Sequence, residues 1–345
     1  MQEKQQKSWL LTILAILFLT PCLSFADKPF ERIVVFGDSL SDPGNAFFLT
    51  GRKLKPPYST LDAFLIPDGP YARGGKHFSN GATWVEQLAK PLDLGDTVGP
   101  AFKGENEDKL KKSNYAVGGA RAHDNGIDIN LTAQAGAFFT DAQGVAPGDA
   151  LYVIALGGND VRDAVAALAV DGSGAASVDI LTAALTAISD NILALYDSGA
   201  RTFLVGNSPD LSLTPAIRTL DLVSPGAAMA AALFSAQFNA ELDTLLDTLG
   251  ALLPEIQIAR LDLYQSLHDL VANPANYGLK NVLDACVMPD EPPFACKKAK
   301  RYLFWDGIHP TKTTHRILAE KAHQALTSII PEQQDGSEEV FDDTR

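Results

Sequence analysis

The feature that most constrains the fold of this chain is a series of short apolar runs that alternate with stretches of helical spacing. Continuous apolar runs of this length predict strands that are buried on both faces. Strands that alternate with helices predict a parallel sheet with helices on both sides. The predicted strands are Arg32–Phe36, Ser113–Val117, Ala150–Leu156, Thr202–Val205 and Ile256–Leu261, and the predicted helices are Leu181–Tyr196, Ala227–Leu252 and Thr311–Ile329. We therefore expect an α/β fold.

Length, composition and charge indicate the class of protein, the number of domains and the partners that the chain can bind. The chain has 345 residues, of which 46% are hydrophobic and 20% are charged, a composition typical of globular proteins rather than disordered or collagenous ones. No internal repeat or linker divides it, so residues 27–330 are predicted to form a single domain. The formal net charge of −14 disfavours both a nucleic-acid partner and electrostatic docking on anionic membranes.

Residues 1–26 have the order of a signal peptide. Lys4 and Lys7 give a positive start, Trp9–Leu19 is almost wholly apolar, and Ser24–Ala26 places small residues at the two positions that a signal peptidase reads. An uncleaved membrane anchor is disfavoured because the apolar run is shorter than the roughly 20 residues that span a bilayer. We expect cleavage after the last of these residues, and a secreted or periplasmic bacterial protein without a stable membrane anchor.

Two cysteines, Cys286 and Cys296, remain after removal of the signal peptide. An even pair in an exported protein predicts a disulfide. A metal site is disfavoured because the sequence nearby offers no obvious Cys or His partners. At the other end of the domain, Pro331–Arg345 holds six acidic residues and little apolar content, so it is predicted to be a solvated, flexible tail.

Four short motifs carry the candidate chemistry, and the first is Phe36–Asp42, directly after the first predicted strand. Its serine, Ser39, lies at the carboxyl end of a strand, where α/β proteins bind ligands. The alternative is that the Asp and Ser residues only cap a helix. A G-x-S-x-G nucleophile elbow, the other common hydrolase signal, surrounds none of the serines.

Two further motifs follow the second and third predicted strands. Asn114–Ala120 contains Gly118 and Gly119, where a backbone N–H could approach a reacting oxygen, although the segment could equally be a tight turn. Gly157–Asp160 contains Asn159, whose side chain could donate an N–H, although asparagine is also a common turn former. Each of these motifs alone is a weak signal.

The fourth motif is Trp305–Pro310, just before the last predicted helix. Asp306 and His309 are three residues apart, a spacing that suits a carboxylate which holds the tautomer and orientation of an imidazole. Alone, the motif would more often be a turn that starts a helix, yet the other five histidines have no carboxylate partner in a comparable turn. A serine, two candidate N–H donors and an Asp–His pair together favour a hydrolase site at one edge of the sheet.

Together the four motifs resemble blocks I, II, III and V of the GDSL esterase/lipase family, also called SGNH hydrolases, over most of the chain. The resemblance implies a three-layer α/β/α sandwich with a central parallel sheet of flavodoxin-like type, and acyl-ester hydrolysis without a cofactor or metal. It implies that Ser39 is the nucleophile, His309 the general base and Asp306 the residue that orients His309. It also implies an oxyanion hole formed by the N–H groups of Ser39 and Gly119 and by the side chain of Asn159.

Two other segments, Phe78–Leu88 and Tyr302–Asp306, are similar to secreted bacterial GDSL lipases and lysophospholipases, a subgroup that also contains glycerophospholipid acyltransferases. The spacing of Cys286 and Cys296 upstream of Asp306 is similar too, and we expect the loop that they close to lie near the site. We therefore predict a serine hydrolase that cleaves lipid or other acyl esters through an acyl-enzyme, as a lipase or lysophospholipase A with acyl transfer as a further activity. The alternatives are a carbohydrate O-acetyl esterase and a non-catalytic exported binding protein.

Two regions are predicted to shape the substrate site. The loop-rich stretch 47–113 is long for a single connection, and such excursions often form binding sites. Phe47–Leu49, just past the nucleophile, are predicted either to line an acyl pocket or to belong to the core of the first helix.

Overall fold

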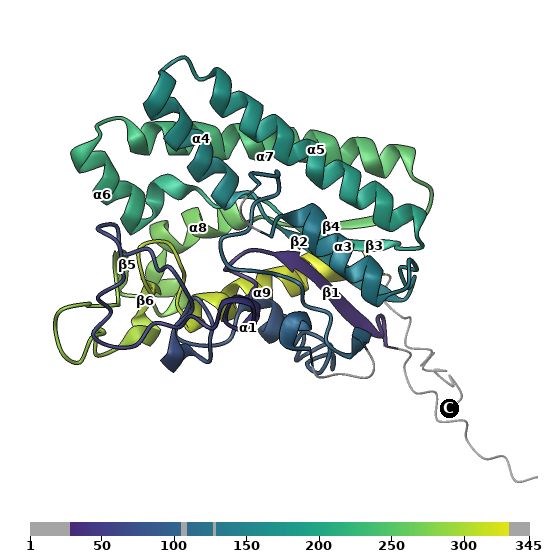
Figure 1. Cartoon of the computed structure of the whole chain (residues 1–345), viewed down its shortest axis with the longest axis horizontal. Helices are drawn as coiled ribbons and strands as arrows, with labels where there is room; N and C mark the ends of the chain where they lie inside the picture. The colour runs from purple at the N-terminus through teal and green to yellow at the C-terminus, as the bar shows by residue number, and fades with distance from the viewer. Residues whose placement is uncertain (1–27, 105–108, 127–128, 331–345) are drawn as a thin grey trace, which may run out of the picture.

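The structure is a computed structural model that describes residues 28–104, 109–126 and 129–330 (Figure 1). The predicted signal peptide, residues 1–26, and the predicted acidic tail, residues 331–345, lie outside the described residues.

Four parallel strands form the central sheet: β1 (Arg32–Gly37), β2 (Ala150–Ala155), β3 (Thr202–Gly206) and β4 (Gln257–Leu261). They are hydrogen-bonded in the order β1-β2-β3-β4. Their centres are rich in Val, Ile, Leu and Phe, which suit a buried pleated surface, and every residue of β2 and β3 is buried. Four of the five predicted strands are confirmed, each within one residue of its predicted bounds.

The remaining predicted strand, Ser113–Val117, is wrong as a regular strand. The segment runs parallel to β1, yet it forms only one isolated bridge with that strand, Asn114 opposite Val35, and one further bond from the N–H of Val117 to the carbonyl of Gly37 (3.1 Å). The cause is Gln134, whose side chain accepts the N–H of Gly37 (2.9 Å) and donates to its carbonyl (2.9 Å). Because the N–H of Gly37 is already bonded to Gln134, it is not available for the next hydrogen bond of a regular ladder between β1 and this segment. With this edge segment counted, the strand order is the flavodoxin-like 2-1-3-4-5.

The helices confirm the predicted alternation with strands. The predicted helix over residues 227–252 is present with the same bounds, and those over 181–196 and 311–329 correspond to α5 and α9. The α-helices are α1 (Asn45–Thr50), α2 (Trp84–Leu88), α3 (Leu131–Asp141), α4 (Gly158–Asp171), α5 (Ala175–Asp197), α6 (Pro215–Val223), α7 (Ala227–Leu252), α8 (Leu263–Ala272) and α9 (Lys312–Thr327). Short 3-10 helices cover Ala72–Gly74, Ala101–Lys103, Lys109–Lys111, Leu211–Leu213, Pro274–Tyr277 and Ala299–Arg301.

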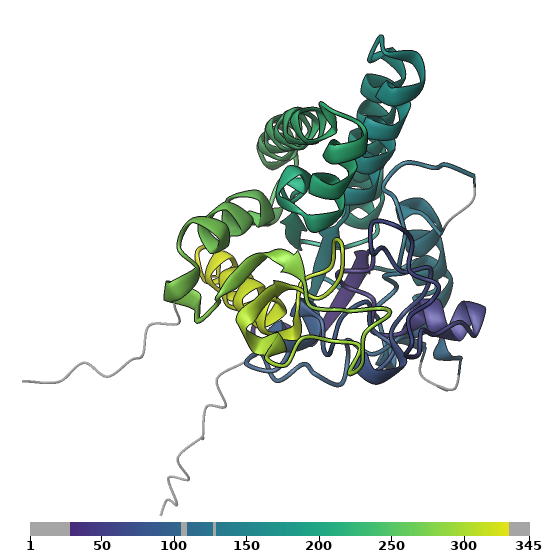
Figure 2. The same ribbon diagram turned by 90° about the vertical axis from the view of Figure 1, so that its left-hand side faces the viewer.

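The pleat of the strands sends alternate side chains to opposite faces of the sheet, and each face has its own core (Figure 1 and Figure 2). Val34 and Phe36 of β1 point to the face that α3, α4, α5 and α7 cover. Ile33 and Val35 point to the other face, which α2 and α9 cover. The molecule is therefore a three-layer α/β/α sandwich, and the predicted fold class is confirmed.

One helix in the described part of the chain, α5, is long and apolar enough to cross a membrane by length and hydropathy alone. Its residues Leu181, Ile188, Ile192 and Leu195 are buried in the core on the α3–α7 face of the sheet. The apolar stripe of α5 is thus the inner face of an amphipathic core helix.

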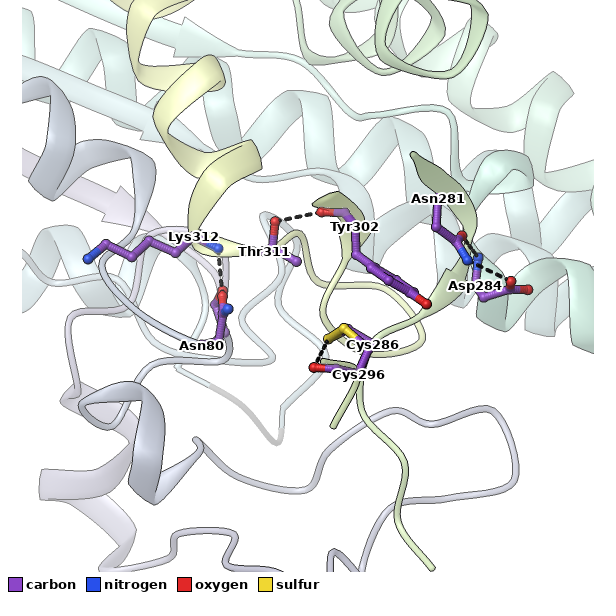
Figure 3. The surroundings of a disulfide bond; sticks show 9 residues. Asn80, Asn281, Asp284, Cys286, Cys296, Tyr302, Thr311 and Lys312 are labelled. Atoms are coloured by element: carbon purple, nitrogen blue, oxygen red, sulfur yellow. Dashed lines mark hydrogen bonds between the residues drawn. A yellow bond between two sulfur atoms is a disulfide. The ribbon is translucent and has the colours of Figure 1, made fainter. Parts of the chain in front are cut away.

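A second, two-stranded parallel sheet, which the sequence patterns did not predict, consists of β5 (Asn281–Ala285) and β6 (Tyr302–Phe304). The predicted Cys286–Cys296 disulfide is present and follows β5 directly (Figure 3). Beyond β6, the hydroxyl of Thr311 donates to the carbonyl of Tyr302 (2.8 Å) at the start of α9. Within the disulfide loop, the N–H of Val287 donates to the carbonyl of Trp305 (2.8 Å), so the loop lies next to the segment that joins β6 to α9.

His315 on α9 makes stability depend on pH. It is buried, and its Nδ1 has no hydrogen-bond partner among the residues that the structure describes. Burial is the main cause that lowers the pKa of His315 to about 3, helped by His77 and His309 and opposed by Glu86. In the unfolded chain the pKa returns to about 6.5. As the pH falls below that value, only the unfolded state takes up a proton on His315. The free energy of unfolding therefore falls by about 1.4 kcal/mol per pH unit.

We expect a His315→Leu variant to lose this dependence. Between about pH 6 and pH 4, urea unfolding should give a free energy of unfolding whose pH slope is smaller than that of the unchanged protein by about one proton. The same slope in both proteins would contradict the assignment of the effect to His315.

Candidate active site

Ser39, Asp306 and His309 lie together at the carboxyl end of β1. His309 Nε2 is 2.8 Å from Ser39 Oγ, although the two residues are 270 positions apart. His309 Nδ1 is 2.8 Å from Asp306 Oδ2 and 2.9 Å from Asp306 Oδ1. All three residues are buried, and Ser39 retains 8% of its exposure. The structure thus brings together the three residues that the sequence predicted to act together.

The hydrogen bonds of His309 set its tautomer. An ionised Asp306 carboxylate has only acceptor atoms, so Nδ1 of His309 carries the proton and Nε2 presents a lone pair to the hydroxyl of Ser39. The turn holds this arrangement, because Asp306 Oδ1 also accepts the backbone N–H groups of Ile308 (3.0 Å) and His309 (2.8 Å). An imidazole in this state can take a proton from Ser39.

The loop-rich stretch before α2 supports the Asp306 turn. Tyr71, which is fully buried, donates its hydroxyl to Asp306 Oδ2 (2.9 Å). The N–H of Gly307 donates to the carbonyl of Leu65 (2.9 Å), and a Cβ on Gly307 would lie 2.0 Å from the carbonyl oxygen of Phe64. Only glycine fits at that approach. The stretch therefore shapes the site, as predicted.

Two buried aspartates hold the turn around Ser39. Asp38 accepts a backbone N–H two residues further on (2.9 Å), and burial raises the pKa of Asp38 to about 6. Asp42 accepts three N–H groups at the start of α1 and also the N–H of Gly118 (2.9 Å). Burial raises the pKa of Asp42 to about 6 against the opposing effect of these N–H groups. The helix-cap alternative for this motif is thus correct for Asp42, whereas Ser39 faces His309.

Two backbone N–H groups at this edge of the sheet, those of Ser39 and Gly119, have no partner in the described part of the chain. Gly118, by contrast, donates to Asp42, and a Cβ on it would lie 2.1 Å from the ring of Phe78. Gly119 has a φ of 86°, a left-handed conformation that glycine adopts without strain. These observations favour Gly119 over Gly118 as an N–H donor, in agreement with the motif spacing.

Asn159 is the second residue of α4, so it lies at the positive end of that helix dipole. Its Nδ2 donates to the carbonyl of Ala120 (2.9 Å), and its Oδ1 accepts from Arg162 (3.1 Å). These bonds fix the orientation of the amide and leave one Nδ2 hydrogen for another acceptor. Asn159 lines the same small cavity as Ser39 and His309.

The loop that carries Gly119 is tied to α4. Asp160 accepts the backbone N–H of His123 (3.0 Å) and its Nδ1–H (2.6 Å). Arg121 forms a two-bond pair with Asp163 (2.8 and 3.0 Å) and donates to the carbonyl of Gly119 (2.5 Å). The helix that presents Asn159 therefore also fixes the backbone at Gly119, so two predicted donors are positioned as a unit.

An apolar groove of about 720 Å³ adjoins the Ser39 cavity. It runs between α4, α6 and the start of α7, and Phe64 and Ile66 contribute to its wall. Arg162 and Ile308 line both the groove and the Ser39 cavity, so the two spaces meet there. An apolar group in the groove could therefore be continuous with a carbonyl at the serine.

Comparison with known proteins decides the family. A family model described as GDSL-like lipase/acylhydrolase matches residues 33–322. The chain belongs to this family. A GDSL esterase/lipase of Arabidopsis thaliana (At5g42170) is 29% identical over 327 residues, which cover 84% of each chain. A phosphatidylcholine-sterol acyltransferase of Aeromonas hydrophila is 26% identical over 371 residues, which cover 93% of this chain and 98% of the relative.

A solved structure is also similar to this GDSL acylhydrolase. A catalytic mutant of an acetylxylan esterase from Geobacillus stearothermophilus aligns with a TM-score of 0.45 and 12% identity, over 86% of this chain and 93% of that chain. Membership of the GDSL family makes the chain a serine acyl-ester hydrolase.

Several residues of this GDSL acylhydrolase site had no predicted role. Tyr71 bonds to Asp306 from a distant segment, Asp160 bonds to His123 in the loop that carries Gly119, and Arg162 bonds to Asn159 within α4. The ring of Phe78 lies 5.4 Å from that of His309, between ring centres, and forms part of the wall beside Gly118. The family-like segment that begins at Phe78 was a usable signal, whereas nothing local marks Tyr71.

Neither prediction for Phe47–Leu49 is correct. The three residues line neither the groove nor the Ser39 cavity, and they are half-buried or exposed, whereas α1 buries Asn45 and Ala46. The ammonium group of Lys76 lies 4.0 and 4.6 Å from the centres of the two phenylalanine rings. The rings are therefore covered by a cation at the surface, an arrangement that stabilises exposed aromatic residues.

Proposed function

We propose that this GDSL acylhydrolase is an exported lipase or lysophospholipase that releases fatty acids through an acyl-enzyme on Ser39. The observation that carries the proposal is the apolar groove that meets the Ser39 cavity at Arg162 and Ile308. A fatty acyl chain would bury its methylene groups in such a groove, each worth about 0.8 kcal/mol. An acetyl group would leave the groove empty.

In the proposed reaction, Ser39 Oγ attacks the ester carbonyl while His309 Nε2 takes its proton, because these two atoms already lie 2.8 Å apart. Asp306, which is bonded to Nδ1, stabilises the imidazolium that forms. Negative charge develops on the former carbonyl oxygen. The N–H groups of Ser39, Gly119 and Asn159 stabilise it as donors whose positions are fixed in advance.

Collapse of the tetrahedral intermediate breaks the ester bond. His309 gives its proton to the leaving alcohol, and the acyl group stays on Ser39. Water then attacks the acyl-enzyme with His309 again as the base, and the fatty acid leaves. An alcohol in place of water would receive the acyl group, so acyl transfer is a second outcome of the same intermediate. The name of the Aeromonas relative, an acyltransferase, supports this part of the proposal.

Lysophospholipids are the proposed substrate class. The similarity of Phe78–Leu88 and Tyr302–Asp306 to secreted lysophospholipases supports this choice. Phe78 packs against His309, and the Tyr302–Asp306 segment leads from β6 into the Asp306 turn, so both segments lie at the proposed site.

Export is part of the proposal. The order of charged, apolar and small residues in residues 1–26 supports it, and so does the Cys286–Cys296 disulfide, because such bonds persist in oxidising compartments. Mass spectrometry of the protein from cell fractions is expected to find a chain that starts at Asp27 outside the cytoplasm. An uncleaved chain in the cytoplasm would contradict the proposal.

A bulky residue in the groove is expected to shorten the acyl chains that the enzyme accepts. Ala166 lies on α4 one turn after Arg162, lines the groove and is exposed. Ala166→Trp therefore fills groove space without replacing a core side chain. We expect kcat/KM for a long-chain p-nitrophenyl ester to fall by about 10-fold to 100-fold, because two or three methylene groups lose their burial. A butyrate ester should lose much less.

Ala183→Trp is the matched control for this change. Ala183 is an exposed alanine on α5 that does not line the groove. The control should keep the ratio between the rates on the two esters. Equal losses on both esters in Ala166→Trp would contradict the assignment of the groove to the acyl chain.

The proposed function is tested by acyl release from lysophosphatidylcholine, phosphatidylcholine and acetylated xylan, with Ser39→Ala as the control. We expect fatty acid release from lysophosphatidylcholine that disappears in Ser39→Ala. Acetate release from xylan as the dominant activity would replace the lipolytic proposal by a carbohydrate esterase. Full activity in Ser39→Ala would overturn the site itself.

A further inference from the structure

The α4–α5 turn and the α6–α7 turn lie at the same end of the layer that holds α4, α5, α6 and α7 (Figure 1). Six of the ten large hydrophobic residues that are exposed in the described chain lie near the α4–α5 turn and the α6–α7 turn. We call them the apolar rim, which consists of Val170, Val178, Leu222, Val223, Met229 and Leu233. Val170 is 89% exposed and Leu222 is 82% exposed. A cluster of such side chains marks an interaction surface.

The apolar rim borders the groove that adjoins Ser39. Leu168 and Ala230 line both the groove and a second, shallow hollow, and Val178 and Leu233 of the rim line that hollow as well. The α6–α7 turn, which directly follows the rim residues of α6, lines the groove itself. A surface lined mainly by apolar residues therefore leads from the rim into the groove, which meets the cavity of the candidate nucleophile at Arg162 and Ile308.

Hydrogen bonds hold the two turns of the rim in shape. Asp171 accepts the N–H groups of Ser173 (3.0 Å) and Gly174 (3.4 Å) at the α4–α5 turn. Asp221 accepts those of Gly226 (2.9 Å) and Ala228 (3.0 Å) at the α6–α7 turn. Carboxylates that are bonded to their own turns fix the local backbone, so the apolar side chains stay presented to solvent.

The charge around the apolar rim determines which kind of surface the rim can bind. The sequence from 164 to 180 and from 219 to 240 contains no lysine or arginine, and the whole chain carries a net charge of −14. Anionic headgroups would find no cation at these turns and would be repelled by the overall charge. The same charge disfavours a second copy of the chain at this surface, which would also close the groove.

We infer that the apolar rim docks on a zwitterionic lipid bilayer and passes the acyl chain of a docked lipid into the groove. The inference rests on the proposed function, since it needs a lipid substrate. The rim side chains enter the interface, the turns lie at the headgroup level, and the acyl chain moves along apolar surface to the serine without crossing water.

The test measures docking without catalysis. Ser39→Ala protein is sedimented with phosphatidylcholine vesicles and compared with the same protein that also carries Leu222→Ser, Val223→Ser and Met229→Ser. We expect the rim variant to bind at least about 10-fold more weakly, because three apolar side chains no longer leave water on docking. Thermal melting of both proteins checks that the rim variant is folded.

The matched control replaces exposed apolar residues outside the rim. Val145 and Leu252 are 61% and 69% exposed, and Val145→Ser with Leu252→Ser in the Ser39→Ala protein should bind vesicles as the parent does. Phosphatidylglycerol added to the vesicles should weaken binding at low salt, in accord with the net charge.

Three results would overturn the docking surface. They are equal binding of the rim variant and the parent, an equal loss in the control, and a rim-dependent dimer in ultracentrifugation without vesicle binding. The proposed function has a separate readout. If protein with an intact Ser39 releases no fatty acid from lysophosphatidylcholine added to these vesicles although the Ser39→Ala protein docks through the rim, the lipolytic function fails and the docking surface stands.

Discussion

The His309→Ala variant is expected to hydrolyse acyl esters about 10⁴-fold to 10⁶-fold more slowly than the unchanged enzyme. His309 is the histidine that bonds to the Ser39 hydroxyl, and without it no base takes the serine proton as the carbonyl is attacked. The measurement is kcat/KM on a soluble p-nitrophenyl ester. What remains should come from substrate binding and from the oxyanion donors.

His323→Ala is the matched control for this loss. His323 lies on α9, the helix that follows the His309 turn, and lines neither the Ser39 cavity nor the groove. It should keep the activity of the unchanged enzyme. A loss of less than about 10-fold in His309→Ala would contradict general-base catalysis by His309, since removal of a base in such a triad costs far more.

The Asn159→Ala variant is expected to lower kcat by about 10²-fold to 10³-fold with little change in KM, which is the usual cost of one oxyanion donor. The free Nδ2 hydrogen of Asn159 acts on charge that exists only in the transition state. The substrate carbonyl carries little charge, so ground-state binding should hardly change.

Asn191→Ala is the control for loss of a buried asparagine. The amide of Asn191 bonds to Thr132 (3.0 Å) and to the carbonyl of Ala187 (2.8 Å), within the helical layer and outside the Ser39 cavity. It should keep kcat. A raised KM with an unchanged kcat in Asn159→Ala would contradict the oxyanion role, because that pattern reports loss of uniform binding.

Strands β1, β2 and β3 could be predicted because they are buried almost throughout, so their apolar runs are continuous and end at or next to a glycine. The edge segment Ser113–Val117 also ends at a glycine pair but does not form a regular strand. The Gln134 side chain, 97 residues away in the sequence, occupies backbone groups of Gly37 that a regular strand pair would use. No local pattern reveals such a tertiary bond, and the same holds for the small sheet of β5 and β6, which is half exposed.

The candidate site was predictable to the extent that its residues follow strand ends within short motifs. Supporting residues were not, because their partners are distant. Tyr71 reaches Asp306 across 235 residues, and His123 finds a carboxylate partner, Asp160, on another element. The groove could not be predicted either, since it is the space left between three helices whose packing no single segment encodes.

The most direct test of an activated Ser39 is labelling with a long-chain alkyl fluorophosphonate followed by peptide mass spectrometry, since the reagent reacts with serines that a base has activated. We predict a single labelled peptide that contains Ser39, at about one label per chain, and labelling at least about 100-fold slower in His309→Ala. Label on a different serine, or an unchanged labelling rate in His309→Ala, would contradict the assignment of nucleophile and base.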